Sequence, residues 1–116
     1  MSTKEIAQGL VDLCKAGKFE DAMNAYYSDE IVSTEPMGEE PVSRGIAAVK
    51  AKGEWWYSTF EVHSVVVTGP FVNGEQFIVG FELDTTNRKS GERSLMKEAG
   101  LYTVSGDKIV EEKFYF

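Results

Sequence analysis

Cysteine and histidine are almost absent from this chain, which narrows the chemistry open to it. Its 116 residues include one cysteine, Cys14, and one histidine, His63. A single cysteine excludes an internal disulfide and a cysteine-rich metal centre, and a zinc site would need several carboxylates as ligands. We therefore expect no metal and no cofactor. Cys14 lies in an apolar helical pattern without basic neighbours and is predicted to be a small core residue.

Positive charge is also scarce. Twelve Lys and Arg residues stand against 19 Asp and Glu residues, giving a net charge of -7. Nucleic acids and anionic membrane surfaces attract basic patches, so neither is expected as a partner. No apolar run approaches the roughly 20 residues of a membrane span. Because Met1–Glu5 also lacks a signal-peptide pattern, we expect a cytoplasmic protein.

The remaining composition is that of a globular protein, with 42% apolar and 27% charged residues. A chain of this length folds as one domain, here residues 1–116, and buries roughly two thirds of its unfolded surface. Three helices are predicted first. Thr3 would cap a helix that runs to about Ala16, a second helix covers Phe19–Tyr27, and Ser43 would cap a third over Arg44–Ser58.

One short strand and then a run of long strands complete the pattern. The short strand is predicted before the third helix and the others after it: Ile31–Thr34, Glu61–Thr68, Phe71–Val72, Gln76–Thr85, Arg93–Ser105 and Ile109–Phe116. Together the elements predict an α+β domain. Long antiparallel strands with helices on one face would curl into an open cone around an apolar cavity.

The segment between the short strand and the third helix holds the first candidate catalytic residue. Pro36 biases Glu35 toward an extended backbone at the end of the strand. Beside the apolar Met37, this carboxylate is a candidate general base with a raised pKa. The alternative is that Glu35 is an ordinary solvated turn residue.

The order of elements and four stretches of sequence resemble a known group of proteins. The stretches are Leu13–Ala22, Glu35–Gly38 with Arg44–Val49, Arg93–Val104, and Gly106–Tyr115. They resemble the nuclear transport factor 2-like superfamily, specifically its SnoaL-like polyketide cyclase and ketosteroid isomerase branch. The resemblance implies three N-terminal helices on a strongly curved, mainly antiparallel sheet. It also implies a homodimer formed through the sheet face and a small hydrophobic ligand.

The same resemblance bears on individual residues. Ketosteroid isomerases place their general-base Asp before a Pro-x-Gly turn, and Glu35 occupies that place here. The isomerase oxyanion hole does not carry over, because its two positions fall on Leu10 and Gly100. Steroid isomerisation that relies on those two oxyanion-hole residues is therefore not expected.

Other polar groups would take the place of that oxyanion hole. If the strand phase of the family holds, Glu98, Tyr102 and Glu112 point into the cone. An apolar wall would surround them, made of Phe77, Phe81, Met96, Phe114 and Phe116. Carboxyls gathered in an apolar pocket cannot all remain ionised, so one would keep its proton near neutral pH. A phase shifted by one residue would instead place Glu98 and Glu112 in solvent.

The residues predicted to act on a substrate form two sets. Glu35, Glu98 and Glu112 are the candidate catalytic residues. The candidate substrate-binding residues are Tyr26, Met37, Trp56, His63, Phe81, Met96, Tyr102 and Phe114. Two of these have alternatives, since Tyr27 could supply the hydroxyl in place of Tyr26, and His63 could be a structural or interface residue. Arg93 and Lys97 are predicted to face outward and pair with Glu82 or Asp84.

Three functions fit these features. The first is a cofactor-free acid–base enzyme of the isomerase, cyclase, dehydratase or hydrolase type, acting on a small apolar carbonyl-bearing or cyclic substrate. The second is a non-catalytic binder of a hydrophobic metabolite. The third is a dimerisation module without turnover. The fold alone does not choose among them, so whether the protein is an enzyme stays open.

Overall fold

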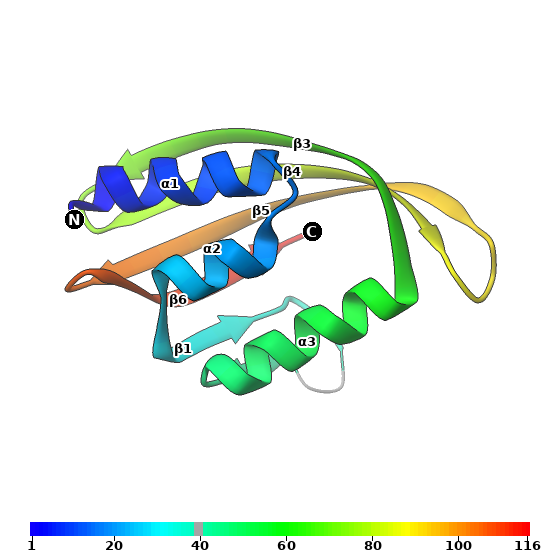
Figure 1. The fold of residues 1–116 in the computed structure, drawn as a ribbon, viewed down its shortest axis with the longest axis horizontal. Coiled ribbons are helices and arrows are strands. Elements are labelled where there is room, and N and C mark those ends of the chain that lie inside the picture. Colours follow the sequence, from blue (N-terminus) through cyan, green and yellow to red (C-terminus); the bar gives the residue numbers. More distant parts are fainter. Residues whose placement is uncertain (39–40) are drawn as a thin grey trace.

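The computed structural model describes residues 1–38 and 41–116, which form three helices and six strands (Figure 1). In chain order these are α1 (Thr3–Lys15), α2 (Phe19–Tyr26), β1 (Tyr27–Thr34), β2 (Val42–Arg44), α3 (Ile46–Thr59), β3 (Phe60–Asn73), β4 (Gln76–Asn87), β5 (Arg93–Ser105) and β6 (Lys108–Tyr115). None of the helices in these two ranges has both the length and the apolar content needed to cross a membrane.

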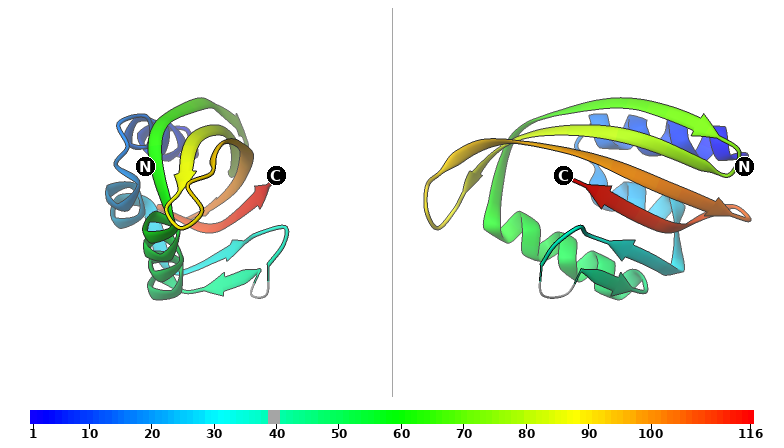
Figure 2. Two further views of the ribbon diagram at one scale, coloured as in Figure 1. Left: turned by 90° about the vertical axis from the view of Figure 1, so that its right-hand side faces the viewer. Right: turned by 180° about the vertical axis from the view of Figure 1, so that it is seen from behind.

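The six strands form one sheet that curls without closing. Their order is β2-β1-β6-β5-β4-β3, so β2 and β3 are its edges. Every neighbouring pair is antiparallel except β1 with β6, which is parallel. Seen along its long axis the sheet bends into an incomplete ring (Figure 2). The predicted α+β architecture with a curved, mainly antiparallel sheet is confirmed.

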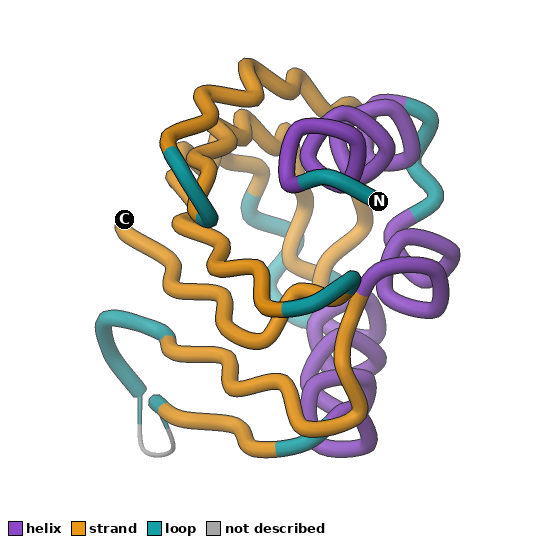
Figure 3. Tube along the Cα trace, turned by 90° about the vertical axis from the view of Figure 1, so that its left-hand side faces the viewer, coloured by secondary structure: helices purple, strands orange, loops and turns teal. Residues whose placement is uncertain are grey.

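The helices cover the concave face of this sheet (Figure 3). α1 packs on β3 and β4, and α3 packs on β1, β2 and β3. Alternation along β4 buries one side of the strand in this interface, as expected for a period of two. The core includes Ile6, Leu10, Cys14, Ile31, Phe77, Val79, Tyr102 and Ile109. Cys14 is therefore the buried core residue that the sequence predicts.

Two predicted helix caps are wrong. Ser2, not Thr3, caps α1, because its side chain accepts from the Glu5 N–H while its own backbone N–H donates to the Glu5 carboxylate. Ser43 lies in the three-residue strand β2, which the sequence analysis missed. Gly45 precedes α3 instead, with a φ of 88°, a backbone conformation open mainly to glycine. Its N–H donates to the Ile31 carbonyl at 2.7 Å and ties the start of α3 to β1.

Two strand boundaries also differ from the prediction. β1 begins at Tyr27 rather than Ile31, because the chain leaves its helix at Tyr26 and pairs with β6 at once. Phe71–Val72 is not a separate strand but the continuation of β3 beyond a register shift. The earlier start of β1 matters for function, since it brings Tyr27 into the sheet.

Candidate functional site

Side chains alternate between the two faces of the sheet along β5 and β6, and the alternation places polar residues of both strands on the concave face. Tyr102 on β5 and Glu112 on β6 are directly paired and are only 2% and 3% exposed. The next inward pair is Gly100 with Phe114. Since side chains alternate along a strand, Glu98 points to the same side as Gly100 and Tyr102. The predicted phase is confirmed, and the one-residue shift is excluded.

Glu112 is held at the bottom of the cone by a tyrosine. The Tyr27 hydroxyl donates a hydrogen bond to Glu112 Oε1. Burial raises the pKa of Glu112, while hydrogen bonding to Tyr27 and Ser33 and the charge of Lys52 act in the opposite direction. Burial, reinforced by the negative charge of Glu112, also raises the pKa of Tyr27, so this phenol remains a proton donor.

An ion pair lies nearer to solvent, where α3 rests against β1. We call this place the mouth of the site. Lys52 Nζ lies 2.8 Å from Glu35 Oε1 and 2.5 Å from Ser33 Oγ. About a quarter of each charged side chain is exposed, 26% for Lys52 and 25% for Glu35. Glu35 therefore forms one half of an ion pair with a lysine, a partner that the sequence analysis did not predict.

Glu98 is the third carboxyl and the one best placed to titrate near neutrality. It is half-buried on β5. Burial raises its pKa to about 7, and the negative charges of Glu35 and Glu112 add to the shift, while Lys52 opposes it. Burial is thus the largest cause of the shift. A carboxyl with a pKa in this range can accept or release a proton near neutral pH.

Tyr102 closes the space left by a glycine. Its ring stacks on Phe77 at a centroid distance of 4.9 Å. A Cβ atom at Gly100 would meet Tyr102 Cε2 at 2.8 Å and Tyr102 Oη at 3.1 Å. The tyrosine thus folds back over the position at which the sequence places the strand Asp of the isomerases. That position carries no side chain here, and the Tyr102 hydroxyl lies beside it.

Four predicted apolar binding residues pack in or around the core, and one of them contacts a charged group of the site. The Phe114 ring centroid lies 5.5 Å from Lys52 Nζ, within the range of a cation–π contact. Trp56, one helical turn beyond Lys52, packs edge-on against Tyr57 and tilted against Phe60. Phe81 belongs to the core, and Met96 packs against it. The predicted binding residues Trp56, Phe81, Met96 and Phe114 therefore belong to the core or pack against it, and Phe114 also contacts Lys52.

The structure does not bring four other predicted residues to the carboxyls. Tyr26 packs on α1, where its hydroxyl lies 1.9 Å from the point that a Cβ at Gly9 would occupy. His63 is exposed, with Nε2 at 2.6 Å from Thr86 Oγ1. Met37 and Phe116 are 63% and 56% exposed, so neither belongs to the apolar wall. For two residues the structure agrees with the alternative prediction. Tyr27, not Tyr26, brings its hydroxyl to a carboxyl, and His63 contacts Thr86 on the neighbouring strand.

Sequence reasoning missed Lys52 and Ser33 altogether. On α3, Val49 and Trp56 lie three residues before and four residues after Lys52, a spacing that places all three on one helical face. A lysine on an apolar helical face is a signal that a charged partner lies opposite. Ser33 gave no comparable signal, because buried serines in strands are common. Within the described ranges, no three His, Cys, Asp or Glu side chains are arranged to hold a metal ion.

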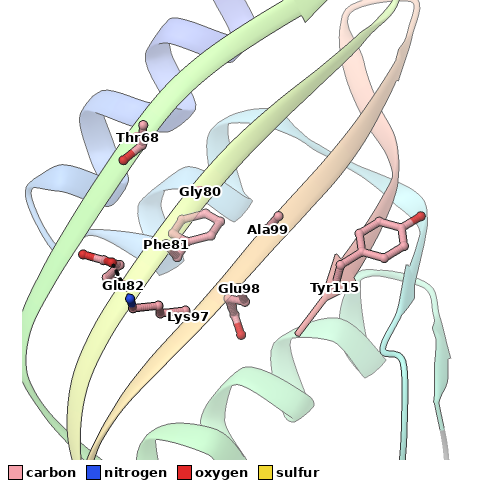
Figure 4. A pocket seen from close by; sticks show the side chains of 8 residues that line it. All are labelled: Thr68, Gly80, Phe81, Glu82, Lys97, Glu98, Ala99 and Tyr115. Carbon is pink, nitrogen blue, oxygen red and sulfur yellow. Dashed lines mark ion pairs between the residues drawn. The ribbon is translucent and has the colours of Figure 1, made fainter.

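The outer face of the sheet has a different character. Arg93 forms a two-pronged pair with Asp84 at 3.0 and 2.8 Å, and Lys97 Nζ lies 3.6 Å from Glu82. These predicted pairs are confirmed. Small residues leave a shallow hollow between β3 and β6, which is lined by Thr68, Gly80, Phe81, Glu82, Lys97, Glu98, Ala99 and Tyr115. Figure 4 shows Lys97 reaching toward Glu82, with Glu98 turned away from that pair.

Comparison with known proteins decides the family. A model of the SnoaL-like domain matches residues 1–116. The chain belongs to the SnoaL-like family. A solved structure from Mesorhizobium loti, of a proposed SnoaL-like polyketide cyclase whose name also carries the words carbohydrate phosphatase, is 44% identical to this SnoaL-like protein. The match covers 100% of both chains with a TM-score of 0.96.

More distant structures share the fold of this SnoaL-like protein. One, from Catenulispora acidiphila, has a ketosteroid isomerase-like fold and is in complex with trimethylamine. It is 15% identical, with coverage of 99% and 87% of the two chains and a TM-score of 0.76. Another is TerC co-crystallised with polyporic acid, at 11% identity, 98% and 90% coverage and a TM-score of 0.77. No match is found among curated proteins. The resemblance in the sequence is thereby confirmed for family and fold.

Proposed function

We propose that this SnoaL-like protein is a cofactor-independent enzyme that transfers a proton next to the carbonyl group of a small, mostly apolar substrate. One observation carries the proposal. Glu98 is half-buried beside the Glu35–Lys52 ion pair and the buried Glu112, with a pKa of about 7. A carboxyl with such a pKa works as a base and then as an acid at neutral pH.

The chemistry follows from the charges around Glu98. The Glu98 carboxylate takes a proton from the carbon next to the carbonyl, and the electrons of that C–H bond form the enolate. Lys52 supplies the positive charge that stabilises the enolate oxygen. Protonated Glu98 then returns its proton to the same carbon or to another carbon of the conjugated system. Isomerisation, elimination of water and aldol-type ring closure all share this first step.

Each partner keeps a distinct role in this scheme. Glu35 orients Lys52 through the ion pair at 2.8 Å. Glu112 raises the proton affinity of Glu98 by its negative charge. The side chains of Trp56, Met96 and Phe114 are proposed to contact the apolar part of the substrate. Small organic molecules held by two structural relatives, trimethylamine and polyporic acid, support a small-molecule role for this fold.

Hydrogen–deuterium exchange tests the proposal without knowledge of the natural substrate. The protein is incubated in D₂O with enolisable probes, 2-tetralone and cyclohexane-1,3-dione, and deuterium uptake next to the carbonyl is followed by NMR. Glu98→Gln is expected to reduce the catalysed rate on the order of 10²-fold or more. Glu82→Gln is the matched control on the outer face and should keep the rate. The wild-type rate should rise with pH through about 7, as Glu98 becomes a carboxylate.

Two results would remove the proposal. The first is a wild-type exchange rate no higher than that of the Glu98→Gln variant with either probe. The second is a pH–rate profile that does not change in the Glu98→Gln variant. Saturable binding of a probe without exchange would favour the alternative, a non-catalytic binder of a hydrophobic metabolite.

A further inference from the structure

The buried hydroxyl of Ser33 lies between the Glu35–Lys52 ion pair at the mouth of the site and the buried carboxyl of Glu112. Ser33 on β1 is 0% exposed. In the parallel pairing of β1 with β6, Ser33 stands in register with Glu112. On its other side, Ser33 Oγ lies 2.5 Å from Lys52 Nζ. One small side chain therefore contacts the ammonium of the ion pair and interacts with the buried carboxyl.

The direction of these hydrogen bonds is set by chemistry. A lysine ammonium only donates, so Ser33 Oγ is the acceptor toward Lys52. The single proton of the hydroxyl is then free for Glu112. This agrees with the effect of Ser33 on that carboxyl, since hydrogen bonding to Ser33 lowers the pKa of Glu112. Ser33 is thus satisfied on both sides, as a fully buried hydroxyl should be.

We propose that Ser33 is a positioning residue that holds Lys52 at the mouth, so that one ammonium group pairs with Glu35 while its charge acts on both Glu98 and Glu112. The proposal rests on the proposed function only in assigning the proton transfer to Glu98. Lysine is a flexible point charge, and Ser33 and Glu35 together fix its position. Without the hydroxyl, Lys52 keeps only Glu35 and can follow it toward solvent.

The charges around Glu98 make this position matter. The charged groups that act on Glu98 are Glu35, Glu112 and Lys52, and Lys52 is the positive one. Tyr102 lies close enough for its own pKa to respond to Glu98. Moving Lys52 away removes the favourable charge and leaves the two carboxylates in place. The proton affinity of Glu98 then increases, and the pH at which it becomes a base moves upward.

An NMR titration of the Glu98 carboxyl carbon tests this directly. Lys52→Met is expected to raise the pKa of Glu98. This increase should be the largest among the variants, because the positive charge is removed completely. Ser33→Ala, which removes only the hydroxyl, should shift it in the same direction by a smaller amount, because Lys52 keeps its contact with Glu35. Thr85→Val is the matched control, because it removes another fully buried hydroxyl of the sheet. It should leave Glu98 unchanged.

A measurement on the wild-type protein supplies a second test that needs no variant. The Nζ protons of Lys52, observed through ¹⁵N, should exchange with water more slowly than those of the exposed Lys97, because two acceptors hold them. Exchange as fast as that of Lys97 overturns the proposal. So does a Glu98 titration that moves in Lys52→Met but not in Ser33→Ala.

These results separate the two proposals. The titration requires no turnover, so a shift in Ser33→Ala without ketone exchange would keep the role of Ser33 and remove the proposed enzyme function. Conversely, exchange that depends on Glu98 but shows the same pH midpoint in Ser33→Ala would keep the enzyme and remove the role of Ser33. If both hold, Ser33→Ala moves the midpoint of the pH–rate profile upward.

Discussion

The Tyr27 hydroxyl donates a hydrogen bond to the Glu112 carboxyl. Tyr27 is the first residue after α2, and Glu112 lies near the end of the chain on β6. This bond therefore ties the junction of helix and sheet to the bottom of the cone. It also gives a buried carboxyl a donor in a place where an unpaired charge would be strongly unfavourable.

Removing this donor should weaken the fold and change the titration of the carboxyl. Tyr27→Phe keeps the ring and removes the hydrogen bond, so the pKa of Glu112 should rise further. We expect the free energy of unfolding to fall by about 1–3 kcal/mol, measured by urea denaturation at neutral pH. Tyr26→Phe is the control, because the Tyr26 hydroxyl packs against Gly9 on α1. Equal losses in the two variants would contradict the assignment.

Glu98 should make the folded protein less stable as the pH rises. Its pKa is about 7 in the folded chain against an ordinary value of 4.5. Between these values the folded state binds more protons than the unfolded state, so the free energy of unfolding decreases with increasing pH. Glu98→Gln removes this decrease. The variant should exceed the wild type by about 1–3 kcal/mol near pH 8.

The same comparison near pH 4.5 provides the internal control. There Glu98 of the wild type is protonated in the folded state and about half protonated in the unfolded state, so the advantage of Glu98→Gln should shrink to within about 0.5 kcal/mol. Urea denaturation at the two pH values measures both differences. A difference between the proteins that does not change with pH would show that Glu98 titrates normally.

The packing of Tyr102 over Gly100 predicts a sharp sensitivity to a single methyl group. In Gly100→Ala the new Cβ would lie 2.8 Å from Tyr102 Cε2, which is too close, and the ring must move. We expect a loss of about 1–3 kcal/mol in unfolding free energy. Gly80→Ala is the matched control on β4, since its Cβ would meet Thr68 Cβ at an ordinary 3.5 Å. A loss in the control as large as in Gly100→Ala would argue against the clash.

Thr85 is a position at which a substitution should increase the free energy of unfolding. It is 0% exposed, and within residues 1–38 and 41–116 its Oγ1 has no hydrogen-bond partner. Thr85→Val replaces the hydroxyl by a methyl group of similar size. Because an unsatisfied buried polar group is unfavourable, the variant should gain about 1 kcal/mol, read from the urea midpoint. A loss of stability would mean that the hydroxyl is satisfied in solution.

The outer face of the sheet is the expected dimer surface. Val66 and Ile78 point outward from β3 and β4 and are 53% and 45% exposed, alongside the charge pairs of Arg93 and Lys97. We expect a homodimer in light scattering at micromolar concentration, and Ile78→Lys should dissociate it. Val42→Lys, on the edge strand β2 and 41% exposed, is the control. A monomeric wild type would end this expectation.

The sequence by itself determined the fold class. The direction of the inward-facing residues on β5 and β6 was predicted from the strand phase of the resembling family, and a shift of one residue stayed open until the structure excluded it. Alternation along β5 and β6 has a period of two, so burying Tyr102 also turns Glu98 to the concave side. Glu112 follows in the same way from Phe114. Hydrophobic periodicity alone does not choose the face of β5, because apolar residues stand on both, such as Met96 and Val104 on one face and Leu95 and Leu101 on the other. The order of the helices and the curling of the sheet followed from the pattern of elements, and the family resemblance implied the same architecture.

Only the tertiary structure decided which side chains meet across elements. Lys52 reaches Glu35 and Ser33 because α3 lies against β1 in one particular rotation, which a helical pattern does not specify. Tyr27 rather than Tyr26 reaches Glu112 because the helix ends one residue earlier than its pattern suggests. A shift of one residue at such a junction changes which side chain enters the sheet. Periodicity shows which face of an element is apolar, whereas the partners of the polar groups depend on how those faces are placed against one another.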